Sequence, residues 1–165
     1  MFINTLPPLT RNVTCAVTGH RVMRRDFNPS ELEKELSDIA DDGYEYFLIG
    51  MARGFDTECF HALEALREKG KNVKIVAVVP CKDQSARFPA AAKEEYARML
   101  GVADEVIAEP SDYFDGCMLK RNDFLVENCS LLLANYNGIK KGGTYYTIRR
   151  AIALGVTVRE FGRNL

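Results

Sequence analysis

The sequence predicts an α/β fold, a doubly wound and mostly parallel sheet of about six strands with helices on both faces. Short apolar runs such as 75–79 and 131–134 have no polar face, which is typical of parallel strands that helices cover on both sides. Longer segments with the apolar period of helices lie between these runs. Because 165 residues is the length of one domain, we expect a single domain over 1–165 with an N-terminal extension at 1–12.

Six short apolar segments are the predicted strands: 13–18, 46–49, 73–79, 105–108, 131–134 and 156–161. Five predicted helices separate them, at about 28–39, 55–69, 90–100, 116–129 and 143–154. The first helix has a clear start signal. Asn28 can cap it, Pro29 suits its first position, and Glu31 brings an acid into its first turn.

Composition narrows the classes of function. Lys plus Arg is 22 and Asp plus Glu is 23, so no global field draws the chain to nucleic acid or to anionic membranes. No apolar run approaches the roughly 20 residues that span a bilayer, and residues 1–12 lack a signal-peptide pattern, so we expect a cytoplasmic protein without a membrane partner. Five scattered cysteines and two histidines favour reduced thiols and no metal site. Magnesium would enter only together with a phosphate ligand.

The loops that follow the strands are the candidate site, because ligands of doubly wound sheets bind at the carboxyl ends of the strands. Three such loops combine glycine, basic residues and hydroxyls. Their candidate binding residues are Thr18, Gly19, His20, Arg21, Gly50, Met51, Ala52, Arg53, Gly54, Asp56, Gly142, Gly143 and Thr144. Glycine lets backbone N–H groups approach an anion, and a helix N-terminus adds partial positive charge, so each loop could cradle a phosphate. The other interpretation is a set of glycine-rich turns in which Thr144 caps a helix.

Positive charge is dense after the first of these loops. We expect Arg21, next to the strand end, to bind an anion, and we expect Arg24 and Arg25 to lie on the solvated surface. His20 could hydrogen-bond a ligand or carry a proton, or it could be an ordinary loop histidine.

The predicted helix over 116–129 adds a buried charge. Its apolar stripe consists of Met118, Phe124, Leu125 and Cys129. Arg121 continues this stripe, so its guanidinium should point inward, and a buried Arg needs a partner. That partner is either a protein carboxylate, such as Asp56 or Asp115, or an anionic ligand. Asn122, at the edge of the stripe, could order a loop or contact a base or sugar.

Together these motifs resemble the YpsA-like branch of the SLOG superfamily, which includes the DNA-processing protein A group and the Lonely Guy phosphoribohydrolases. The resemblance extends from Thr14 to about Phe161. It implies a Rossmann-like fold and a pocket for a nucleotide-derived ligand: a nucleoside phosphate, an ADP-ribose or an NAD-like molecule. In that pocket the second loop and the Gly142–Gly143–Thr144 turn would hold phosphate and ribose, with Arg121 and Asn122 over the same site. Superfamily members often dimerise, so a homodimer is among the expected partners.

Three functions follow, and whether the chain is an enzyme stays open. The first is binding or sensing of the nucleotide-derived ligand. The second is an N-glycosidase acting on nucleoside 5′-monophosphates, but the Lonely Guy enzymes use a Glu where this chain has Thr147, so Asp56, Glu58 or His20 would have to replace it. The third is single-stranded DNA binding, for which Tyr136, Tyr145 and Tyr146 could stack on bases.

Overall fold

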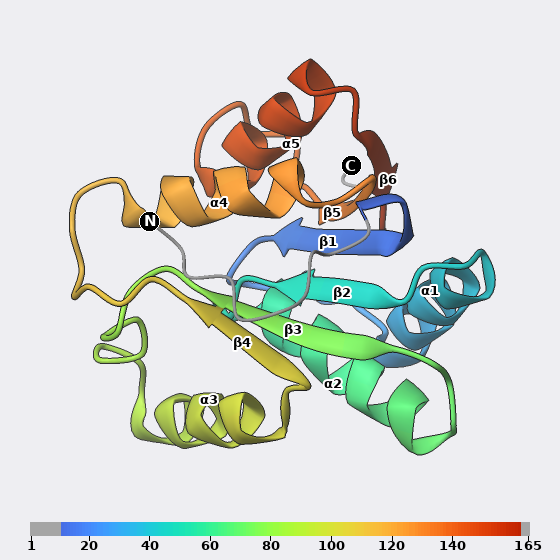
Figure 1. Ribbon diagram of the computed structural model, residues 1–165, viewed down its shortest axis with the longest axis horizontal. Helices are drawn as coiled ribbons and strands as arrows, with labels where there is room; N and C mark the ends of the chain where they lie inside the picture. The colour runs from blue at the N-terminus through green and yellow to red at the C-terminus, as the bar shows by residue number, and fades with distance from the viewer. Residues whose placement is uncertain (1–10, 163–165) are drawn as a thin grey trace.

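The computed structural model describes residues 11–162, and Figure 1 shows their arrangement. A short 3-10 helix at Arg11–Val13 precedes the first strand. The strands are β1 (Thr14–Gly19), β2 (Tyr46–Ile49), β3 (Lys74–Val79), β4 (Glu105–Ala108), β5 (Leu131–Asn135) and β6 (Thr157–Glu160). The helices are α1 (Pro29–Asp41), α2 (Phe55–Glu68), α3 (Ala90–Val102), α4 (Cys117–Glu127) and α5 (Gly143–Ala153).

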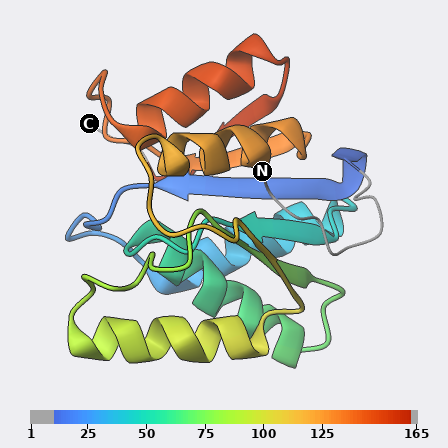
Figure 2. The same ribbon diagram turned by 60° about the vertical axis from the view of Figure 1, so that its left-hand side comes forward.

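The six strands form one sheet in the order β4-β3-β2-β1-β5-β6, and every neighbouring pair is parallel. The chain starts near the middle with β1, moves outward to β4, and returns through α4 to β5 on the other side of β1. Helices α1, α2 and α3 cover one face, whereas α4 and α5 cover the other (Figures 1 and 2). The predicted doubly wound α/β fold is therefore confirmed, and the sheet is parallel throughout.

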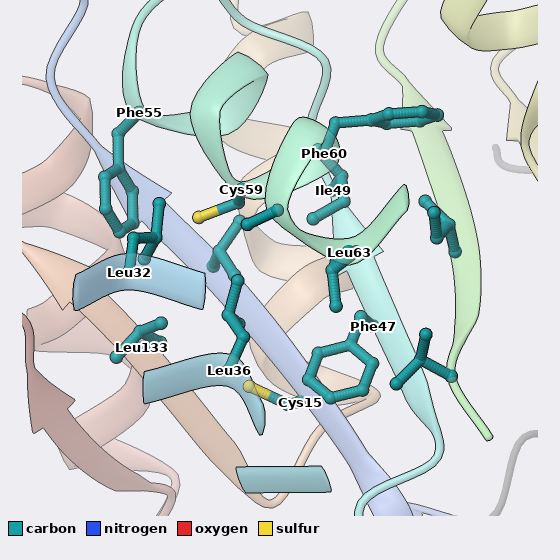
Figure 3. Close-up of a cluster of buried hydrophobic side chains, with 14 of the residues drawn as sticks. Cys15, Leu32, Leu36, Phe47, Ile49, Phe55, Cys59, Phe60, Leu63 and Leu133 are labelled. Carbon is teal, nitrogen blue, oxygen red and sulfur yellow. The ribbon is translucent and has the colours of Figure 1, made fainter. Parts of the chain in front are cut away.

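Buried side chains fill the space on both faces of the sheet. Successive residues of a strand alternate between the two sides: Cys15 and Val17 of β1 belong to the cluster under α1 and α2, whereas Ala16 belongs to the cluster under α4 and α5. Figure 3 shows the larger cluster, where Leu36 of α1 and Phe47 of β2 lie among side chains of β1 and α2. Because both faces are covered, the strands have no polar face, as the sequence indicated.

The local signals at the first helix are also confirmed. The Asn28 side chain accepts a hydrogen bond from the Ser30 backbone N–H at 2.9 Å, and Pro29 is the first helical residue. Several predicted ends differ by one or two residues. The first strand starts at Thr14 rather than residue 13 because 11–13 form a 3-10 turn, and α4 ends at Glu127 rather than residue 129.

Two further expectations concern the N-terminal extension and membrane-spanning segments. Residues 1–10 of the predicted N-terminal extension lie outside the described residues. Within the part that is described, no helix is both long enough and apolar enough to cross a membrane.

Candidate functional site

A cavity of about 320 Å³ opens at the carboxyl end of the sheet, where the chain turns from β1 to one side and from β5 to the other. This is the topological switch point of a doubly wound sheet, where such folds bind ligands. Most of the predicted binding residues line the cavity. They are Thr18, Gly19, His20, Arg21, Ala52, Arg53, Asp56, Arg121, Asn122, Gly143 and Thr144.

The other four predicted residues do not line the cavity. Gly50 and Gly54 allow close approaches: a Cβ on Gly50 would lie 2.7 Å from the Arg121 guanidinium carbon, and one on Gly54 would lie 2.3 Å from the Arg21 carbonyl oxygen. Gly142 precedes α5 with a φ of 92°, a value that favours glycine. Met51 is buried in the core, 2% exposed, with the positive φ of 64° that non-glycine residues rarely adopt.

Arg121 is the buried cation of the cavity, 5% exposed, and it points inward as predicted. One terminal nitrogen, Nη1, donates to the carbonyls of Gly50 and Val78, and Nε donates to Asn122 Oδ1 at 2.9 Å. Within residues 11–162, Nη2 makes no hydrogen bond and no carboxylate forms an ion pair with this guanidinium. Neither Asp56 nor Asp115 is thus its ion-pair partner, and the second terminal nitrogen is available to a ligand.

Asp56 is the buried acid of the same cavity, 6% exposed. Its Oδ2 accepts a hydrogen bond from the Ala52 backbone N–H at 3.1 Å, whereas Oδ1 makes no hydrogen bond to any described residue. Burial raises the pKa of Asp56 to about 6, although the nearby charge of Arg121 and the Ala52 hydrogen bond act in the opposite direction. Its raised pKa brings the titration of Asp56 close to neutral pH.

The N-terminus of α5 faces the cavity through Gly143 and Thr144. No side chain caps this helix, so its first N–H groups keep their hydrogen-bonding capacity. Asn122 lies against the same turn: its Nδ2 is 3.6 Å from the position that a Cβ on Gly143 would take. Because the oxygen of Asn122 accepts from Arg121, its amide nitrogen is left to donate. Thr144 therefore does not act as the cap that the alternative interpretation required.

His20 joins the first loop to the loop after β5. The Asn137 backbone N–H donates to Nε2 of His20 at 3.0 Å, so the ring proton of the neutral imidazole is on Nδ1. Burial lowers the pKa of His20, which favours this neutral form. The ring also stacks on Tyr136, with centroids 6.2 Å apart, and Tyr136 stacks on Tyr145 at the same separation. An aromatic row thus runs outward from the cavity.

The cavity also contains residues that were not predicted. They are Val17, Gln84, Phe88, Met118 and Leu125. Gln84 and Phe88 come from the loop after β3, which the strand-end rule includes but which has no glycine motif to single it out. Met118 was expected in the buried stripe of α4 and is instead 37% exposed, because the beginning of α4 borders the cavity opening.

Gln84, the polar residue that was not predicted, shares a hydrogen-bond acceptor with Arg121. Gln84 donates from Nε2 to the Gly50 carbonyl at 3.0 Å, the same carbonyl that accepts from Arg121, and its Oε1 accepts from the Tyr96 hydroxyl at 2.8 Å. Arg53 lies over the ring of Phe88, 5.8 Å from its centroid. The loop after β3 therefore closes one side of the cavity.

Positive charge is left unpaired around the cavity. Arg21 lines the cavity, and Lys140 and Lys141 come shortly before the lining residue Gly143; all three are exposed and form no ion pair with any described residue. Arg24, by contrast, pairs with Asp26 on the surface, and Arg25 is exposed, in line with the predicted surface position of both. The loops at this edge of the sheet therefore present unpaired positive charge next to the cavity.

Other candidate chemistry lies elsewhere in the molecule. His61 is exposed and contacts Glu95 at 2.6 Å, away from the cavity. Across residues 11–162, no group of three or more His, Cys, Asp or Glu residues could hold a metal ion. The five cysteines are free and buried.

Solved structures confirm the fold by comparison. The chain superposes on DNA processing protein A from Streptococcus pneumoniae with a TM-score of 0.67 and 20% identity, covering 90% of this chain and 50% of that one. The same protein from Helicobacter pylori gives a TM-score of 0.69 at 17% identity, covering 96% and 67%. At 17% and 20% sequence identity, these superpositions show that the chains share a fold.

Sequence relatives point to one family. An uncharacterized SPbeta prophage-derived protein, YoqJ, from Bacillus subtilis is 30% identical over 58% of this chain, and a UPF0398 protein from Shouchella clausii is 29% identical over 74%. The aligned parts span 63% and 66% of those two relatives. The family model YpsA, described as the YspA SLOG family, matches residues 26–156. Since this match includes most of the chain, the protein belongs to the YpsA family of SLOG proteins.

Proposed function

We propose that the cavity binds a nucleotide-derived small molecule and that Arg121 holds its phosphate. The observation that carries this proposal is the buried guanidinium of Arg121, whose Nη2 has no protein partner among the described residues. A charge taken out of water is costly unless it is paired, and a phosphate would supply the missing pair. The uncapped N-terminus of α5 would add N–H donors and partial positive charge to the same anion.

The size of the cavity supports a ligand of modest size. A volume of about 320 Å³ is at the small end of the range for small-molecule sites, which runs from about 300 to 1,000 Å³. A nucleoside monophosphate suits it better than an intact dinucleotide. Phe88, which lines the cavity beneath Arg53, offers an aromatic ring against which a planar base can pack.

The direct test is to denature purified protein, identify any co-purified small molecule by mass spectrometry, and measure thermal shifts with a nucleotide panel. At about 100 times Kd, a ligand of the folded state adds roughly 2.7 kcal/mol of stability. Arg121→Gln should abolish the shift. Arg67→Gln is a matched control, since it removes a guanidinium that pairs with Asp104 outside the cavity. A shift that survives Arg121→Gln unchanged would refute the site.

Single-stranded nucleic acid is the second candidate, and the aromatic row of His20, Tyr136 and Tyr145 favours it. Arg149 lies 6.0 Å from the centroid of the Tyr145 ring, so the row ends in a cation. Stacking rings with adjacent positive charge are typical of surfaces that bind unpaired strands. The Helicobacter pylori neighbour is described as having a single-stranded DNA binding mode. This candidate predicts a salt-dependent gel shift with an oligonucleotide that a mononucleotide does not compete away.

The N-glycosidase alternative depends on Asp56. Thr147, which stands where the Lonely Guy enzymes have their Glu, is buried and donates its hydroxyl to the Gly143 carbonyl at 2.8 Å. Asp56 is the one carboxylate that lines the cavity among the described residues, and its raised pKa suits a proton carrier. Release of free base from the nucleotide panel, lost in Asp56→Asn, would establish the hydrolase.

A further inference from the structure

Unused hydrogen-bond donors dominate the polar lining of the cavity. Arg121 keeps Nη2, Asn122 keeps both hydrogens of Nδ2, and His20 keeps the proton on Nδ1, since none of these groups donates to a described residue. Thr144 contributes the first-turn N–H of α5 and a hydroxyl. A ligand rich in acceptors, such as a phosphate, satisfies these donors.

Among the amide and carboxylate oxygens that line the cavity, all but one accept a hydrogen bond. Gln84 Oε1 accepts from the Tyr96 hydroxyl, and Asn122 Oδ1 accepts from Arg121. The exception is Oδ1 of Asp56, which accepts no hydrogen bond from any described residue. This carboxylate oxygen can therefore accept a hydrogen bond from a molecule bound in the cavity.

A carboxylate at this place works against a purely anionic ligand. Asp56 is close enough to Arg121 for the two charges to affect each other's pKa, so its negative charge also opposes a phosphate on that guanidinium. Its burial is costly to the fold as well, because the buried carboxylate is not ion-paired. A ligand that brings a hydrogen-bond donor to Oδ1 offsets both costs, since hydrogen bonds to charged acceptors are the strong ones.

We propose that Asp56 accepts a hydrogen bond from a ribose hydroxyl of the ligand, so that the cavity selects phosphorylated ribose derivatives over their dideoxy counterparts. The inference rests on the proposed function and adds the sugar to it. A phosphate on Arg121 and a hydroxyl on Asp56 would fix the two ends of a ribose 5-phosphate group. The base would then lie toward the opening, where Phe88 and Met118 line the wall.

The test compares the 5′-monophosphates of adenosine, guanosine, cytidine and uridine with their 2′,3′-dideoxy forms by isothermal titration calorimetry. Wild-type protein should bind at least one ribonucleotide about tenfold more tightly than its dideoxy form, as expected for a lost hydrogen bond to a charged group. In Asp56→Asn, the amide oxygen should take the position of Oδ2 and accept the hydrogen bond from the Ala52 N–H. The amide N–H₂ group, which is a donor, then occupies the position of Oδ1. The amide can donate to a ribose hydroxyl but lacks the charge of the carboxylate, so that variant should lose most of the discrimination.

The pattern of affinities separates recognition from a structural role. Asp56→Asn should weaken ribonucleotide binding while dideoxy binding stays equal or strengthens, because a negative charge near the phosphate is removed. Loss of both affinities together would overturn the inference. Glu68→Gln, on the same helix but exposed and not lining this cavity, should discriminate as wild type does.

The remaining outcomes distinguish this inference from the proposed function. Equal wild-type affinity for both sugar forms, still abolished by Arg121→Gln, would refute hydroxyl recognition and leave phosphate binding intact. Failure of every nucleotide to bind would refute both.

Discussion

Neutralising Asp56 should stabilise the folded protein. The carboxylate is buried, 6% exposed, without an ion pair among the described residues, and burial raises its pKa from 3.8 to about 6. At about 1.4 kcal/mol for each pKa unit, keeping this group ionised costs the folded state about 3 kcal/mol. Asp56→Asn removes the charge with little change of shape, so the free energy of unfolding at about pH 8 should rise by up to about 3 kcal/mol.

The pH dependence of this effect has a definite sign. Below the unfolded pKa of 3.8 the carboxyl is protonated in both states and costs nothing. As the pH rises from there to about 6, the unfolded chain releases its proton first, so wild-type stability falls. The stabilisation by Asp56→Asn should therefore be full at about pH 8 and nearly absent at about pH 3.

Urea unfolding followed by circular dichroism at the two pH values measures this difference directly. In a thermal melt, about 3 kcal/mol corresponds to roughly 6–12 °C for a domain of this size. Asp112→Asn is the control, since Asp112 is exposed and outside the cavity, and it should change little. If Asp56→Asn is no more stable than wild type at the higher pH, the carboxylate has a stabilising partner and the reasoning from burial is refuted.

Two further predictions concern packing. Gly54→Ala should destabilise the protein by about 2 kcal/mol or more, because the φ of 85° disfavours a side chain and the new Cβ would meet the Arg21 carbonyl, whereas Gly101→Ala, in open space within α3, should stabilise it by roughly 0.5–1 kcal/mol. The urea midpoint of unfolding, measured for both variants, tests these opposite effects on stability. Equal changes of the midpoint in the two variants would contradict the prediction. The five free cysteines should react with a thiol reagent only after unfolding, because all are buried; rapid labelling of native protein would show an opening that the structure does not have.

Local signals in the sequence were enough for the architecture. Apolar runs without a polar face and segments of helical period depend only on neighbouring residues, and each became the expected strand or helix. The cap at Asn28 and the inward direction of Arg121 followed in the same way, because helix geometry fixes which positions share a face. The loops after the strands could be identified as the candidate site since parallel strands end at one edge of the sheet.

Contacts between distant segments were decided only by the tertiary structure. Arg121 meets the Gly50 carbonyl and no carboxylate, and Gln84 reaches that same carbonyl from a loop without any motif. The charge of Arg121, which acts to lower the pKa of Asp56, likewise comes from a segment far away in the chain. Sequence patterns show whether a segment is a helix or a strand and which of its side chains point inward. Which hydrogen-bond donors stay unpaired depends instead on how separate loops pack around one cavity. The sequence by itself therefore determined the fold and the edge of the sheet where the candidate site lies. Packing determined which donors of the cavity stay unpaired and that one carboxylate oxygen of Asp56 is left open.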